Sequence, residues 1–155
     1  MRITPISSVP SAESCRAIND IIQSAIPDNW SMQSIQNLMA LPTTFGFFIS
    51  ADGDQTPSGF ILAAMVSGEA EILSLALYPK YQNRALGRAL LRHFLDYCKI
   101  SACRRIFLDV AADNPVARHV YEIMGFSAYD LRPHYYLRPG HARVDAILMQ
   151  LSIGQ

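Results

Sequence analysis

The sequence predicts an α+β domain in which a mixed central sheet is flanked by helices. Three apolar runs between residues 45 and 78 are joined by short turns, which is typical of an antiparallel meander. The chain then alternates strand, helix, strand and helix, an order that predicts a parallel strand pair linked by a crossover helix. Apolar positions in the helical segments recur with a period near 3.6 residues, as expected for helices that pack against a sheet.

The first third of the chain is predicted to form one strand, over residues 3–6, and two helices. Ser11 and Ser31 can each cap a helix, and Pro27 and Pro42 end these helices because proline cannot continue one. The apolar positions that define them are Cys15, Ile18, Ile22 and Ala25 in the first, and Met32, Ile35, Leu38 and Met39 in the second.

The remaining elements follow from turn signals and apolar patterning. We predict strands at 45–50, 59–66 and 69–78, a helix over 85–99, and a buried strand at 106–111. Asp113 or Asn114 can cap the next helix, which has Pro115 at its first position and Gly125 just past its end. The last strands are expected at 126–132 and 144–151, separated by a loop that contains Pro133, Pro139 and Gly140.

The length and composition fit one globular domain over residues 1–155. Half of the residues are hydrophobic and only 17% are charged, which excludes a disordered chain. The formal net charge is zero, so the basic excess of a nucleic-acid binder is absent and no such partner is expected.

The chain shows neither a secretory signal nor an apolar run long enough to span a membrane. Its three cysteines form an odd number without metal-ligand spacing, and Cys15 and Cys98 fall on the apolar stripes of predicted helices. We therefore expect reduced, packed thiols in a cytoplasmic protein that has no membrane partner and no metal. His93 and His119 are expected on helix surfaces.

The segment from Pro79 to Arg88 predicts an anion site. A strand ends there and a short basic turn opens a helix, so that backbone N–H groups and the positive helix end point to one place. The spacing Gln82-x-x-Ala85-x-Gly87 resembles the pyrophosphate-binding motif of the GCN5-related N-acetyltransferase (GNAT) family. The dinucleotide and P-loop glycine patterns are absent, which argues against a nucleotide-binding fold.

This resemblance implies a GNAT fold, with helices on both faces of the sheet in three layers, and acetyl-CoA as co-substrate. It assigns the coenzyme contacts, including a strand edge for the peptide-like pantetheine arm, to Leu75, Ala76, Leu77, Asn83, Arg84, Ala85, Leu86, Gly87, Arg88 and Asn114. Asn114 can cap its helix as well. Ala85 replaces the family's usual glycine. The exchange of glycine for alanine costs about 1 kcal/mol if this position needs a positive φ. It costs nothing if the position lies within the first helical turn. We expect Ala85 to lie within the first helical turn.

The segment from Leu108 to Phe126 narrows the resemblance. Its pattern Asn-x-x-Ala-x-x-x-Tyr-x-x-x-Gly-Phe is the family's second signature, and Tyr135-Tyr136 and Asp145 to Met149 follow it. Together with Trp30-Ser31, these residues look like the RimI-type branch, the bacterial ribosomal-protein-alanine N-acetyltransferases. The match is good over residues 69–151 and loose before them.

The same resemblance makes Tyr121 the general acid and places Asp109 where the branch carries a glutamate base. Without the family, Tyr121 could pack at the core edge, and Asp109 could pair with an arginine or cap a turn. Glu69 and Glu71 are rival bases, although both are expected to face solvent. Tyr135 and Tyr136 could wall an acceptor channel or be ordinary strand aromatics.

The function implied by the resemblance is direct acetyl transfer from acetyl-CoA to a protein N-terminal α-amine, with a ribosomal protein as partner. Removing the proton from an α-amine at pH 7 costs about 1 kcal/mol, against roughly 4.6 for lysine. Asp109 has a short side chain and is expected to be a weak or water-mediated base, which an α-amine tolerates better than lysine does. Two alternatives stay open: an enzyme that acetylates lysine or a small amine, and a non-catalytic acyl-CoA sensor. We expect a monomer or a weak dimer.

Overall fold

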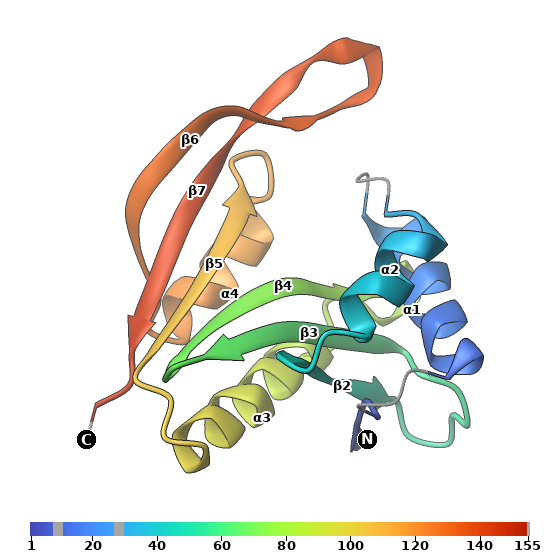
Figure 1. Cartoon of the computed structure of the whole chain (residues 1–155). Helices are drawn as coiled ribbons and strands as arrows, with labels where there is room; N and C mark the ends of the chain where they lie inside the picture. Colours follow the sequence, from blue (N-terminus) through green and yellow to red (C-terminus); the bar gives the residue numbers. More distant parts are fainter. Residues whose placement is uncertain (8–10, 27–29, 155) are drawn as a thin grey trace.

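A mixed sheet of seven strands organises the protein (Figure 1). The computed structural model describes residues 1–7, 11–26 and 30–154. The strand order is β1-β2-β3-β4-β5-β7-β6, and only β4 and β5 pair in parallel. The elements are β1 (Arg2–Pro5), α1 (Ala12–Ala25), α2 (Met32–Met39), β2 (Thr44–Ser50), β3 (Gly59–Val66), β4 (Glu69–Leu77), α3 (Leu86–Ile100), β5 (Arg105–Ala111), α4 (Pro115–Ile123), β6 (Ser127–Leu137) and β7 (Arg143–Ser152).

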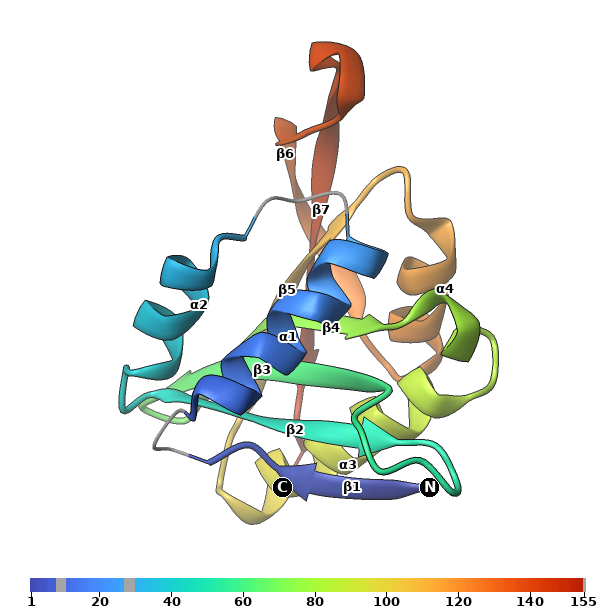
Figure 2. The same cartoon turned by 90° about the vertical axis from the view of Figure 1, so that its right-hand side faces the viewer.

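Two hydrophobic cores lie on the opposite faces of the sheet. Alternate residues of a strand point to opposite faces, and on β2 Phe47 packs into the core of α3 and α4 while Phe48 packs into the core of α1 and α2. Figure 2 shows α1 in front of the sheet and the β6–β7 hairpin extending beyond the rest of the domain. The predicted meander and crossover are both confirmed.

The helix caps form as predicted. The hydroxyl oxygens of Ser11 and Ser31 accept the N–H groups of Ser14 and Ser34, each at 3.0 Å, and start α1 and α2. Asn114, rather than Asp113, caps α4. The predicted end of α1 at Pro27 lies outside the described residues.

The prediction for Ala85 is wrong. Ala85 is the residue before α3 and has φ 61°, in the left-handed region, instead of lying within the first helical turn. Its methyl group makes this conformation unfavourable by about 1 kcal/mol relative to glycine. Asn83 also has a positive φ of 61°, so the turn makes two such bends before α3 begins.

The predicted loop after residue 132 is also wrong in part, because β6 continues through Pro133 to Leu137. β6 is an edge strand, and its pairing with β7 is interrupted between Arg132 and Tyr136. Proline cannot donate a ladder hydrogen bond, but an edge strand with an interruption at this point does not require one.

All three cysteines are free and buried, as their predicted packing requires. Burial, with a smaller contribution from the neighbouring Cys103, raises the pKa of the Cys98 thiol to about 12. His93 and His119 are exposed on α3 and α4, as predicted. The described residues contain no group of three or more His, Cys, Asp or Glu side chains placed to hold a metal ion. None of their helices has the length and apolar character needed to traverse a membrane.

Thr44 is a weak point in the packing at the start of β2. Its buried hydroxyl finds no hydrogen-bond partner among the residues that the structure describes, and an unsatisfied buried polar group costs roughly 1–3 kcal/mol. Replacing Thr44 with valine is therefore expected to raise the free energy of unfolding by about 1 kcal/mol, measured by urea denaturation. Thr43→Val, at an exposed neighbouring position, should leave it unchanged, and a loss of stability in Thr44→Val would contradict the prediction.

Candidate active site

The sheet opens between β4 and β5. The two strands pair over only four residue pairs, from Glu69 opposite Arg105 to Ile72 opposite Leu108. Immediately after Ile72, the register between β3 and β4 shifts so that Leu73 has no partner on β3. Such a bulge bends a strand and increases its twist. The two strands therefore diverge beyond Leu73.

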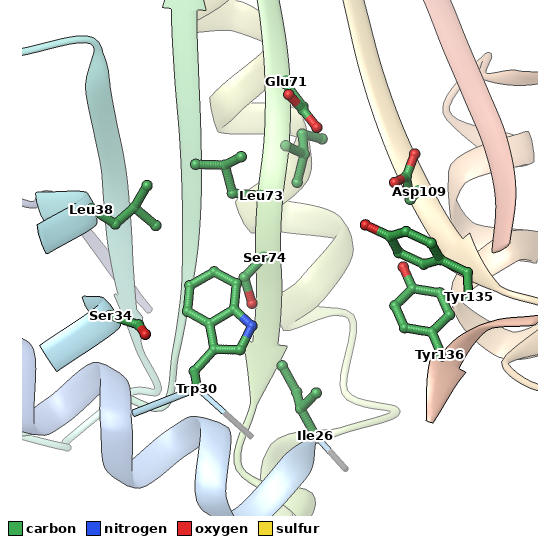
Figure 3. Close-up of a pocket in the computed structure, with 11 residues that line it drawn as sticks. Ile26, Trp30, Ser34, Leu38, Glu71, Leu73, Ser74, Asp109, Tyr135 and Tyr136 are labelled. Atoms are coloured by element: carbon green, nitrogen blue, oxygen red, sulfur yellow. The ribbon is translucent and has the colours of Figure 1, made fainter. Parts of the chain in front are cut away.

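Two adjoining cavities occupy this opening, of about 480 Å³ and 170 Å³. The larger lies against α2 and the tip of the β6–β7 hairpin, and the smaller reaches α4. Figure 3 shows Trp30 and Leu38 on one side of the larger cavity and Asp109, Tyr135 and Tyr136 on the other. The residues that line both cavities are Ile26, Ile72, Leu73, Ser74, Asp109 and Tyr136.

Tyr121 lines the smaller cavity from α4. Its side chain is 8% exposed, and its ring packs edge-on against Phe126 at a centroid distance of 5.7 Å. Burial raises the pKa of Tyr121 above its usual value, so the phenol is protonated at neutral pH. It is therefore a protonated phenol in the lining of the smaller cavity.

Asp109 lies at the junction of the two cavities, on the part of β5 that has left β4. Its side chain is 24% exposed, and its Oδ2 lies 3.6 Å from Nη1 of the largely exposed Arg132. The expected arginine pairing is thus present, in a loose form that leaves the carboxylate in the cavity lining. Glu71 is exposed and lines only the larger cavity, and Glu69 is exposed and lines neither.

Tyr135 lies in the interrupted part of β6, Tyr136 lies where pairing with β7 resumes, and both line the larger cavity. Their rings pack edge-on, with centroids 5.0 Å apart. Of the two interpretations of this pair, a wall of the acceptor channel agrees with the position of both rings in the cavity lining.

The predicted coenzyme residues divide into two groups. Leu75 and Asn114 line the smaller cavity with Asp109 and Tyr121, whereas residues 83–88 lie beyond the end of β4 and line neither cavity. In the described part of the chain, the edge of β4 that faces β5 has no strand partner after Ile72. This leaves Leu75, Ala76 and Leu77 beside an open strand edge.

The turn before α3 keeps its first N–H groups free of a capping side chain, which suits a helix start that receives an anion. Its position is fixed by the Gln82 side-chain amide, which donates to the Leu77 carbonyl oxygen at 3.2 Å. A Cβ atom on Gly87 would lie 3.1 Å from a methyl group of Leu77, so glycine allows α3 to start close to the end of β4.

Several lining residues were not predicted from the sequence. Ser34 and Ser74 carry no local motif, and the apolar Ile26 and Leu38 resemble any helix-packing residue. Arg138 lines the smaller cavity and pairs with Asp113, 25 positions earlier in the chain. No local pattern could have indicated that contact.

Known proteins are similar to this chain in both sequence and fold. The model of the acetyltransferase (GNAT) family matches residues 15–126. The ribosomal protein bS18-alanine N-acetyltransferase of Escherichia coli (strain K12) is 36% identical over 96 residues, which are 62% of this chain and 64% of that relative. In that match the chain therefore spans slightly less than two thirds of the relative's length.

Solved structures extend the similarity to nearly the whole chain. The crystal structure of the ribosomal-protein-S18-alanine N-acetyltransferase from Escherichia coli has a TM-score of 0.87 and 29% identity, covering 99% of this chain and 96% of that one. Arabidopsis thaliana NAA60 in complex with acetyl-CoA has a TM-score of 0.82 at 20% identity, covering 98% of both chains, and shows a shared fold. The predicted fold is confirmed, and the family model covers well over half of the sequence. The chain belongs to the acetyltransferase (GNAT) family.

Proposed function

We propose that the protein transfers an acetyl group from acetyl-CoA directly to the N-terminal α-amine of a protein, and that this acceptor is the N-terminal alanine of ribosomal protein bS18. The observation that carries the proposal is the pair of adjoining cavities, in which a carboxylate on β5 lines both and a protonated phenol on α4 lines the smaller one. Family membership and the relatives that act on bS18 support the choice of reaction and acceptor.

The residues of the smaller cavity and of the turn beyond the end of β4 fit acetyl-CoA. The unpaired edge of β4 at Leu75–Leu77 offers main-chain groups to a pantetheine arm, and the uncapped start of α3 offers N–H groups to a pyrophosphate. Asn83, Arg84, Ala85, Leu86, Gly87 and Arg88 would hold the pyrophosphate in this arrangement. Acetyl-CoA supplies the activated acyl group, and the chain supplies binding and proton transfer.

The proton transfers follow from the two side chains. The amine must lose a proton before it attacks the thioester carbonyl, and Asp109 accepts it, either directly or through a water molecule because the aspartate side chain is short. The departing thiolate must gain a proton, and Tyr121 donates it. Glu71, on the larger cavity only, is the alternative acceptor for the amine proton.

Transfer in one step agrees with the positions of the cysteines. All three belong to the two hydrophobic cores, and none of them lines either cavity. Neither cavity therefore offers a cysteine thiol that could form an acetyl-enzyme intermediate. The acetyl group then passes from sulfur to nitrogen while both substrates are bound.

The proposal is tested with a synthetic bS18 N-terminal peptide that begins with alanine, incubated with acetyl-CoA and the purified protein. We expect release of CoA thiol, and mass spectrometry should place one acetyl group on the α-amine. The matched control is the same peptide with a blocked N-terminus and an added lysine. Acetylation of the control at an equal rate would make lysine the acceptor, and stabilisation by CoA without thiol release would indicate a sensor.

A further inference from the structure

A bidentate ion pair joins Asp113 to Arg138. Nε of Arg138 donates to Oδ2 of Asp113 at 2.9 Å, and Nη2 donates to Oδ1 at 3.1 Å. The Arg138 side chain is only 14% exposed. The hydrogen bond from Arg138 lowers the pKa of Asp113, so the carboxylate is charged at neutral pH. Two parallel hydrogen bonds fix the orientation of the guanidinium as well as its distance.

The two residues belong to different parts of the domain. Asp113 immediately precedes Asn114, the cap of α4, and Arg138 follows the end of β6 at the tip of the β6–β7 hairpin. Beyond the interruption, β6 and β7 pair again only at Tyr136–Val144 and Leu137–Arg143. So short a stretch of hairpin is marginally stable by itself. The ion pair therefore ties a weakly paired tip to the start of α4.

The same arginine contacts a cavity residue. Its guanidinium carbon lies 5.4 Å from the centre of the Tyr136 ring. Tyr136 lines both cavities and Arg138 lines the smaller one. Asp113 thus orients the Arg138 guanidinium, and the guanidinium lies against the Tyr136 ring.

We propose that the Asp113–Arg138 ion pair is a positioning element that holds Tyr136 at the junction of the two cavities and so shapes the surface that binds the acceptor. This inference rests on the proposed function, and with acetyl-CoA at the smaller cavity it assigns the acceptor to the larger one. Neither Asp113 nor Arg138 takes part in proton transfer. Their effect on the acceptor passes through Tyr136.

The test is steady-state kinetics of Asp113→Asn with the bS18 peptide. We expect the peptide KM to rise roughly tenfold, the size expected when a hydrogen bond to a charged group is lost, while kcat and the acetyl-CoA KM change less than about twofold. Arg138→Lys keeps the charge but not the paired hydrogen bonds and should fall between the wild-type protein and Asp113→Asn. The matched control is Glu122→Gln, which removes the Arg118–Glu122 pair (2.8 Å) on α4 at residues that line neither cavity, and should have no effect.

Two readouts do not require turnover. Hydrogen exchange at the amides of residues 136–138 should become faster in Asp113→Asn than in Glu122→Gln, because the tip is released. Trp30 is the only tryptophan and lines the larger cavity, so its fluorescence can follow peptide binding in the presence of CoA. The dissociation constant of the peptide should rise in parallel with KM.

Failure of the proposed function can be distinguished from failure of the positioning role. A wild-type protein that acetylates no peptide refutes the proposed function, and the exchange and fluorescence titrations then decide on the ion pair alone. Unchanged exchange and unchanged peptide affinity in Asp113→Asn overturn the positioning role. A rise in the acetyl-CoA KM in Arg138→Lys, with Asp113→Asn unaffected, would mean that Arg138 contacts the co-substrate directly and would also overturn it.

Discussion

Replacing Tyr121 with phenylalanine is expected to lower kcat for peptide acetylation by about 10²- to 10⁴-fold, the usual contribution of a positioned proton donor. The ring remains, so its packing against Phe126 and the shape of the smaller cavity are kept. Only the hydroxyl, the proposed proton donor to the departing thiolate, is lost. Thiol release and peptide mass spectrometry measure the effect.

The affinity for CoA separates a catalytic role from a structural one. Isothermal titration should give Tyr121→Phe a dissociation constant within about twofold of the wild-type value, because no hydrogen bond of the phenol to CoA is part of the proposed binding. Tyr97→Phe, on the partly exposed surface of α3, is the matched control and should retain full activity. Equal losses in kcat and in CoA affinity would make Tyr121 a structural residue.

Replacing Asp109 with asparagine is expected to lower kcat/KM for the peptide at pH 7 by about 10²-fold, the lower end of the range for general bases. The lower end applies because an α-amine has a pKa near 7.8 and is partly neutral at this pH. The loss should therefore shrink at pH 9, where most of the amine is already neutral. Peptide kinetics at both pH values measure it.

Glu71→Gln is the matched variant for this experiment, because Glu71 lines the larger cavity and carries the same charge. Its kcat/KM should stay within about threefold of the wild-type value if Asp109 is the base, since the proton acceptor is then kept. A large loss in Glu71→Gln with a small one in Asp109→Asn would assign the base to β4 instead. Losses in both that persist at pH 9, where little cationic amine remains, would assign the base role to neither carboxylate and point to a structural role for both.

The order of strands and helices could be predicted because each element has a local signal. Ser11 and Ser31 start helices by capping them, and the alternation around Phe47 and Phe48 divides one strand between two cores. These signals operate over a few residues, which is the range that a single sequence reveals.

Two local predictions failed for reasons that depend on the whole fold. Ala85 adopts a left-handed conformation because α3 must start close against Leu77, a demand that overrides the preference of alanine. Pro133 is tolerated in β6 because that strand lies at the sheet edge and its pairing is interrupted there. The residues next to Pro133 do not indicate that β6 is an edge strand, and those next to Ala85 do not indicate that α3 starts close to Leu77.

The candidate site was predictable only where it coincides with a motif. Asp109, Tyr121 and Asn114 were found through the resemblance, and the structure brings them to one cavity. Arg138 was missed because its significance depends on a carboxylate 25 positions away. Contacts of that range arise because the tip of the β6–β7 hairpin lies beside the start of α4.

The bulge at Leu73, which has no partner on β3, affects how the two parts of the sheet are joined. One wall of the larger cavity, with Trp30 and Leu38, is attached to the first four strands, and the facing wall, with Tyr135 and Tyr136, is attached to the last three. Strand pairing joins these half-sheets over four residue pairs, from Glu69–Arg105 to Ile72–Leu108. A change in the angle between the half-sheets would therefore change the width of the opening, and a molecule bound along the unpaired edge of β4 would occupy the space between them.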